Sequence, residues 1–273
     1  MYIDTHAHLN FPEFKHEVPD VLGRAKKAKV KKIINCGVDL ETSKKSWELA
    51  RKYPEVFASV GIHPHSACDI DMETRTVLMD LAYRPKVIAI GEVGLDYYFL
   101  KRSSKFAKYP SREAQIFAFE QMLDTALELR FPVIVHSREA EADTIAVLKG
   151  YSSSIRGVVH CFSGNYEFAK KILDLGFLLS FTGNITYKSS LDIIDVIKRV
   201  PLGSMMIETD CPYLAPELYR AKRNEPAYVV EVAKKIAEIK DVSLEEVART
   251  TSKKATSFFK LDYIDPRIRR PKL

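Results

Sequence analysis

The chain has 273 residues, of which 46% are hydrophobic and 29% charged, which excludes a disordered protein and fits one large globular domain. A chain of this length buries a large core without structural metals or disulfides, so a bound metal would need a catalytic reason. The formal net charge of +6 favours a polyanionic partner.

The N-terminal segment MYIDTHAHLN has neither a basic stretch nor an apolar run, and no apolar stretch approaches the roughly 20 residues of a membrane helix. We therefore expect a cytoplasmic protein with no membrane partner, and a monomer is compatible with the sequence. The four cysteines are scattered without a C-x-x-C pair, which argues against a zinc ribbon or a disulfide framework.

Short β-type runs alternate with amphipathic helical stretches along the chain. We predict strands at residues 2–5, 32–36, 57–62, 87–91, 133–135, 157–159, 177–181 and 205–207. We predict helices at residues 21–28, 43–52, 73–82, 113–129, 140–149, 168–175, 191–199, 228–239 and 244–258. Thr42 is the expected N-cap of the second helix, and Ser243 with Glu246 predicts a capping box at the last one.

This alternation predicts an α/β protein, a single (β/α)8 TIM barrel with an extra C-terminal helix. The barrel would span residues 1–260, followed by a basic C-terminal tail at 261–273. A doubly wound open sheet is the alternative, but it more often has a glycine-rich phosphate loop after the first strand, and the sequence has none there.

Residue types that bind metals follow the predicted strands, at the end where such a barrel carries its active site. Six of the seven histidines lie there, and imidazole and carboxylate groups are common ligands of divalent cations. The candidate ligands are His6, His8, Glu92, His136, His160 and Asp210. As a set they predict two divalent metal ions, Mg, Mn or Zn. Taken alone, His6 and His8 are equally well explained as a hydrogen-bonded pair, and His136 and His160 are better explained as hydrogen-bonded polar side chains.

Spacing along the strands suggests a role for each ligand. His6 and His8 point to the same face because strand side chains alternate. Glu92 has two carboxylate oxygens, one for each ion, and is the predicted bridge. Asp210 is a candidate ligand and general base that takes a proton from the attacking water, with helix N-capping before Pro212 as the alternative.

Other candidates have weaker signals. His63 and His65 are candidates for contacting a substrate oxyanion, with packing beside Pro64 as the equal alternative. Arg223 is a candidate for pairing with a phosphate, or else a surface-loop arginine. Asp96 is expected to orient a ligand histidine. Aromatic residues that follow strand ends are candidates for stacking on bases, or for plain packing: Tyr97, Tyr98, Phe99, Phe162 and Tyr187.

Eight motifs run in order over nearly the whole chain. They are DTHAHLN from Asp4, GIHPH from Gly61, GEVGLDYY from Gly91, PVIVHSRE from Pro132, HCFSG from His160, FTGNITYK from Phe181, ETDCPYLAP from Glu208 and KRNEP from Lys222. With them the chain resembles the TatD family of metal-dependent deoxyribonucleases, within the amidohydrolase-like barrels.

The resemblance implies that the six ligand positions above hold the metals. It also implies phosphodiester hydrolysis of DNA by a metal-bound hydroxide, with exonucleolytic cleavage from a 3′ end. The loop at residues 100–109 looks longer and more basic than in typical members.

Two other functions compete with the nuclease. Related barrels hydrolyse amides, esters or lactones of small molecules, often with a carboxylated lysine where this chain has Glu92, so that residue favours the nuclease. The third hypothesis is a scaffold that binds nucleic acid without catalysis. The complete set of six candidate ligands argues against it.

Overall fold

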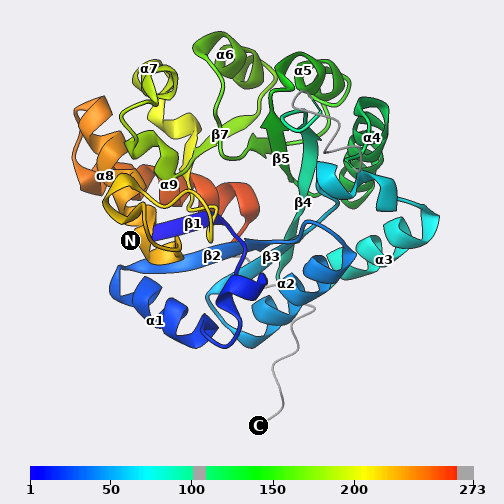
Figure 1. Cartoon of the computed structure of the whole chain (residues 1–273), viewed down its shortest axis with the longest axis horizontal. Helices are drawn as coiled ribbons and strands as arrows, with labels where there is room; N and C mark the ends of the chain where they lie inside the picture. Colours follow the sequence, from blue (N-terminus) through cyan, green and yellow to red (C-terminus); the bar gives the residue numbers. More distant parts are fainter. Residues whose placement is uncertain (101–108, 263–273) are drawn as a thin grey trace.

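The protein is a nearly closed ring of eight parallel strands surrounded by helices (Figure 1). A computed structural model describes residues 1–100 and 109–262. Each strand pairs in parallel with the next in chain order. A bridge between Ala7 and Cys211 brings the chain after the last strand back to the first. The predicted TIM barrel is therefore confirmed.

Three of the strands, those that begin at Tyr2, Val87 and Val133, extend further at the barrel rim than predicted, and the strand predicted to end at Ile62 ends at Val60. They are β1 (Tyr2–Ala7), β2 (Val30–Cys36), β3 (Val56–Val60), β4 (Val87–Asp96), β5 (Val133–Arg138), β6 (Gly157–Val159), β7 (Leu178–Phe181) and β8 (Met205–Ile207). β4 runs to Asp96 rather than Gly91, because its second half pairs with β5 as far as Arg138. The apolar pattern stops at Glu92, so sequence periodicity could not extend the strand.

Each helix lies near its predicted place. They are α1 (Val18–Lys27), α2 (Leu40–Lys52), α3 (Met72–Ala82), α4 (Arg112–Leu129), α5 (Glu141–Lys149), α6 (Tyr166–Asp174), α7 (Leu191–Arg199), α8 (Val229–Lys240) and α9 (Leu244–Phe259). No described helix is long and apolar enough to cross a membrane.

The predicted N-cap of α2 is wrong. Asp39 caps this helix by accepting a 2.7 Å bond from the Thr42 amide, and the Thr42 hydroxyl accepts a 3.0 Å bond from the Asp39 amide in return. Thr42 is thus the third helical residue of a capping box. At α9, the Ser243 hydroxyl accepts a 3.1 Å hydrogen bond from the Glu246 amide, as predicted. This bond is one of the two that make a capping box, and it is the one found among the described residues.

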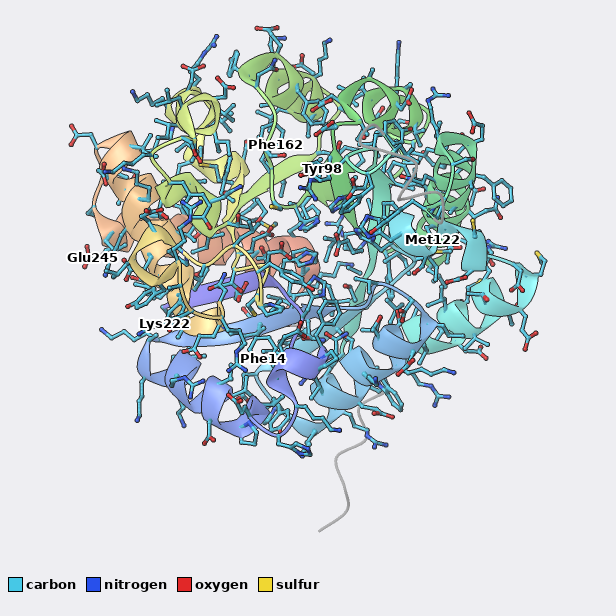
Figure 2. All side chains as sticks on the ribbon, viewed as in Figure 1. Phe14, Tyr98, Met122, Phe162, Lys222 and Glu245 are labelled. Atoms are coloured by element: carbon cyan, nitrogen blue, oxygen red, sulfur yellow. The ribbon has the colours of Figure 1, made fainter. Side chains whose placement is uncertain are left out.

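Large apolar side chains fill the space between strands and helices, among them Phe14, Met122 and Phe162 (Figure 2). A second apolar cluster packs strand residues such as Ile3 and Ile134 against Phe258 of α9. Ile3 lies near the start of β1, so α9 covers the N-terminal end of the barrel. The C-terminal rim remains for the site. Residues 101–108 of the basic loop and 263–273 of the predicted tail lie outside the described residues.

Candidate metal centre

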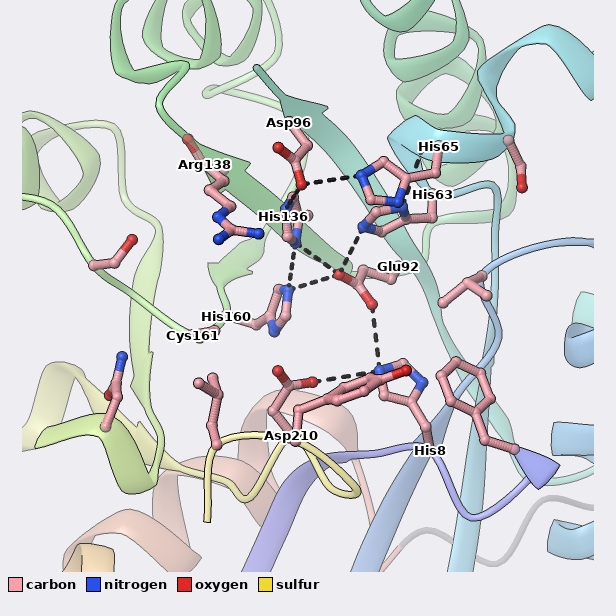
Figure 3. A pocket seen from close by; sticks show the side chains of 18 of the residues that line it. His8, His63, His65, Glu92, Asp96, His136, Arg138, His160, Cys161 and Asp210 are labelled. Atoms are coloured by element: carbon pink, nitrogen blue, oxygen red, sulfur yellow. Dashed lines mark hydrogen bonds and ion pairs between the residues drawn. The ribbon is translucent and has the colours of Figure 1, made fainter. Parts of the chain in front are cut away.

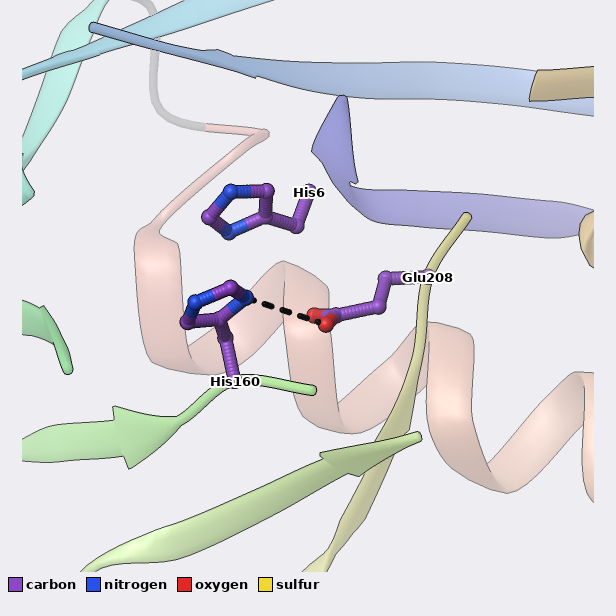
Figure 4. A group of neighbouring side chains, drawn as sticks. All are labelled: His6, His160 and Glu208. Atoms are coloured by element: carbon purple, nitrogen blue, oxygen red, sulfur yellow. Dashed lines mark ion pairs between the residues drawn. The ribbon is translucent and has the colours of Figure 1, made fainter. Parts of the chain in front are cut away.

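The six candidate ligands converge at the C-terminal rim of the barrel. His6 lies in β1, Glu92 in β4 and His136 in β5. His8 and His160 directly follow β1 and β6, and Asp210 lies three residues after β8. Figure 3 shows five of them around one cavity, and Figure 4 shows His6 beside His160. The prediction that distant parts of the chain meet here therefore agrees with the geometry, while the ligand role itself stays a prediction.

One group of ligand atoms surrounds a point between β1 and β4. The Nε2 atoms of His6 and His8 lie 3.1 Å apart. Glu92 Oε2 lies 3.2 Å from the first and 3.5 Å from the second. Asp210 Oδ1 lies 3.8 Å and 3.4 Å from the same two nitrogens. Figure 3 shows His8 with its contacts to Glu92 and Asp210 marked by dashed lines.

The other oxygen of Glu92 faces a second group. Glu92 Oε1 lies 2.8 Å from His136 Nδ1 and 2.8 Å from His160 Nε2, and these two nitrogens are 3.1 Å apart. His63 Nε2 lies 3.5 Å from the same oxygen. Glu92 is therefore positioned between two groups of imidazoles, with one oxygen toward each.

The chemistry of both groups fits divalent cations. Ligands about 2.0–2.1 Å from a tetrahedral ion stand about 3.3 Å from one another, close to the spacing of the first group. The buried Nδ1 of His6 has no hydrogen-bond partner among the described residues. The combination of imidazole nitrogens and carboxylate oxygens suits zinc and manganese, and the carboxylates also suit magnesium.

The carboxylates at the centre are held ionised. Burial alone would raise the pKa of Glu92, but the surrounding imidazoles, His160 foremost, outweigh it and hold that pKa well below the ordinary value. Burial also opposes ionisation of Asp210, yet its contact with His8 keeps the pKa of Asp210 below the ordinary value. Burial lowers the pKa of His63 well below its ordinary value, so this ring is neutral near pH 7. The centre thus offers two anionic groups among nitrogen donors.

A family model described as TatD related DNase matches residues 3–260. The chain belongs to this family. An uncharacterised metal-dependent hydrolase of Bacillus subtilis, YabD, is 36% identical over 96% of this chain and 100% of its own length. A "3′-5′ ssDNA/RNA exonuclease TatD" of Citrobacter rodentium is 30% identical over 94% of this chain and 97% of its own. The solved structure of YJJV, a TatD homologue of Escherichia coli K12, gives a TM-score of 0.86 at 29% identity, covering 95% of this chain and 98% of that one.

In this TatD-related chain, buried carboxylates lie beside the candidate ligand histidines. Asp96 Oδ2 lies 3.3 Å from His136 Nε2 and 3.1 Å from His65 Nε2, which is the orienting position expected for it. Glu208 accepts a 2.6 Å bond from the Cys161 amide and lies 3.4 Å from His160 Nδ1 (Figure 4). Glu208 was not among the predicted site residues, although a carboxylate directly after an apolar strand was a signal for it.

Asp4 links the first and last strands beneath the centre. It is fully buried and accepts bonds from the Thr209 hydroxyl at 2.6 Å and the Thr209 amide at 2.9 Å. The His6 amide also approaches it at 3.3 Å. Asp4 therefore holds the backbone at His6 and at Thr209, which precedes Asp210. The sequence analysis did not select Asp4.

The cavity above the centre has a volume of about 680 Å³. His63 and His65 line it, and so do residues that the sequence analysis did not select, among them Phe11, Arg138 and Tyr213. Phe11 stacks on His8, with ring centroids 4.5 Å apart.

Most of the aromatic residues proposed for base stacking do not line the cavity. Phe99 is the one that lines the cavity among the described residues. Phe162 is buried in the core against Phe168, which agrees with the packing alternative. The Tyr97 hydroxyl donates to Asp143 and the Tyr187 hydroxyl to the Ala215 carbonyl, both at 2.8 Å.

Arg223 does not line the cavity. Its guanidinium donates to Glu17 at 2.7 Å and to the Glu13 carbonyl, and it lies over the ring of Phe14 at 4.4 Å. These contacts hold the loop after β8 against the chain near α1. Its pairing with a phosphate stays a prediction.

Proposed function

We propose that this chain hydrolyses phosphodiester bonds of single-stranded DNA, removing nucleotides from the 3′ end with two divalent cations. The proposed ligands are His6, His8, Glu92, His136, His160 and Asp210, with Mg, Mn or Zn as the metal. The observation that carries this proposal is Glu92, whose two oxygens face two separate groups of imidazoles. A cytoplasmic location and a monomeric state remain predictions.

Bound cations would polarise the scissile phosphate and lower the pKa of the attacking water. Asp210 is ionised and lies at the cavity wall, so its carboxylate would be placed to accept a proton from the attacking water. The neutral ring of His63 lies near the centre and is the proposed contact for a phosphate oxygen.

The cavity also provides surfaces for nucleobases. Phe11, Phe99 and Tyr213 line its wall, and Tyr213 is 51% exposed. Stacking on aromatic faces is tolerant of base identity and is typical of single-strand binding. This favours an unpaired strand over a duplex as the substrate.

The test uses purified, metal-loaded protein with 5′-labelled single-stranded DNA. We expect stepwise shortening from the 3′ end, and we expect Asp210→Asn to lower kcat by about 10²–10⁴-fold because the proton acceptor is lost. Asp192→Asn removes an exposed carboxylate of α7 and serves as the matched control.

Absence of nucleotide release with magnesium, manganese and zinc alike would reject the nuclease. A panel of amides, esters and lactones tests the small-molecule alternative on the same preparation. If Asp210→Asn loses activity but retains DNA affinity, the non-catalytic scaffold is rejected.

A further inference from the structure

Arg138 is the one lysine or arginine among the described residues that line the cavity. Three carboxylates line the same cavity, from Glu92, Asp96 and Asp210. Among the described lining residues, Arg138 therefore offers the permanent positive charge that a polyanionic strand would meet. This residue ends β5, two positions after His136.

The guanidinium of Arg138 is held by an aromatic face. Its Cζ lies 3.7 Å from the ring centroid of Tyr98. The Tyr98 amide donates to Asp96 Oδ1 at 2.9 Å, which anchors this residue beside the centre. Figure 3 shows the Arg138 side chain extending from β5 on the side of His136 and His160.

Stacking occupies the face of a guanidinium and leaves the N–H groups at its edge available. No described carboxylate or carbonyl accepts a hydrogen bond from the Arg138 side chain, which is exposed. A planar fork of this kind suits two oxygens of one phosphate. Arg223, by contrast, already donates to Glu17 and the Glu13 carbonyl.

The position along β5 indicates which phosphate Arg138 meets. Residues two apart in a strand point to the same face and stand about 6.6 Å apart, the length scale of one nucleotide. If the scissile phosphate lies by His136 and Glu92, the next phosphate of the strand falls near Arg138. We propose that Arg138 binds the phosphodiester adjacent to the scissile one and so sets the register of the strand. This inference rests on the proposed nuclease function.

The test is a double-mutant cycle between the protein and the DNA. Single methylphosphonates, which lack the phosphate charge, are placed at the scissile position or at either of the next two upstream positions. Each oligonucleotide is cleaved by the wild-type protein and by Arg138→Gln, Arg138→Lys and Arg199→Gln. Arg199 also stacks on a tyrosine, Tyr166, but lies on α7 outside the cavity lining, so it controls for the loss of one charge.

We expect Arg138→Gln to lower kcat/KM on unmodified DNA by about 10- to 100-fold, mainly through KM, because a charge-assisted bond is lost. Arg138→Lys, which keeps the charge without the fork, should recover part of this. The methylphosphonate next to the scissile position should cost the wild-type protein a similar factor and cost Arg138→Gln less than about twofold. The slope of log DNA affinity against log salt concentration should become shallower in Arg138→Gln, by about the amount expected for one lost phosphate contact.

The inference would be overturned if the effects of Arg138→Gln and of the methylphosphonate at the adjacent position simply multiplied. It would also be overturned if Arg138→Gln were coupled to the methylphosphonate at the scissile position instead. The same cycle, measured as DNA affinity by fluorescence anisotropy in a chelator, does not require hydrolysis. A wild-type protein that releases no nucleotide but shows the coupling would reject the proposed function and retain the role of Arg138. Unchanged melting temperatures of the variants show that the effects are local.

Discussion

Glu208 supports the centre without lying in the cavity lining. It is 1% exposed, and its carboxylate accepts from the Cys161 amide while facing His160 Nδ1. Glu208→Gln keeps an acceptor for the amide but loses the negative charge that orients the imidazole. We expect metal affinity and activity to fall by about 10- to 100-fold with little change in fold. Metal titration and nuclease assays measure this, with exposed Glu245→Gln as the control; equal metal affinity in both variants would contradict it.

Gly94 allows β4 to pass close to β5, the strand that carries His136. Its φ is +137°, and a Cβ there would collide with the carbonyl oxygen of His136. We expect Gly94→Ala to cost about 1–3 kcal/mol of unfolding free energy and to lower activity, because His136 must move.

Gly176 provides the matched control for this substitution. It also has a positive φ, +81°, but a Cβ there has nothing within 4 Å. Gly176→Ala should cost about 1 kcal/mol from backbone strain alone and leave activity unchanged. Urea unfolding and activity assays compare the two variants, and full activity of Gly94→Ala would show that His136 does not depend on this contact.

At the scale of elements, an ion pair joins the starts of α4 and α5 on the outside of the barrel. Arg112 donates to Asp143 at 2.6 Å and 2.7 Å, and this contact holds the pKa of Asp143 below its ordinary value of 3.8. A carboxylate whose pKa is lower in the folded state stabilises the fold above the ordinary value and loses this contribution as the pH falls.

Arg112→Gln should therefore melt at a lower temperature than the wild type at pH 7. The difference should shrink as the pH falls through 3.8 toward the lower pKa of the folded state. Thermal melts of both proteins across this range test it, with Asp143→Asn as a partner variant that should behave alike. A difference that stays constant with pH would mean that Arg112 acts through packing instead.

The elements also show which sequence signals were sufficient. The sixth and eighth predicted strands have the observed bounds, because each is a short apolar run between loops and its two ends mark the ends of the strand. β4 was cut short at Gly91, since a strand entering a polar site no longer shows an apolar pattern. At α2 both Asp39 and Thr42 are good N-cap residues, and only the observed hydrogen bonds distinguish them.

At the scale of the whole molecule, the centre brings together residues from the first and the last strands. Cations that bind only this folded arrangement should stabilise the entire barrel. At 100 times the dissociation constant, one cation contributes about 2.7 kcal/mol, or roughly 5–10 °C in Tm for a domain of this size.

Thermal melts with chelator and with magnesium, manganese or zinc measure this stabilisation, and calorimetry counts the ions. We expect two ions per chain, and Glu92→Gln should weaken both because each carboxylate oxygen faces one group. Binding of one ion, with no effect of Glu92→Gln on it, would contradict the proposed bridge.

The sequence alone determined the barrel and the set of candidate ligands, because strand ends in a parallel barrel share one rim and the histidines and carboxylates there stand out from apolar runs. The tertiary structure decided which oxygen of Glu92 faces which imidazole, and it revealed the buried supports Asp4 and Glu208. It also showed that Arg138 lines the cavity, whereas Arg223 donates to Glu17. These outcomes depend on distances between segments far apart in the chain, which no local pattern records.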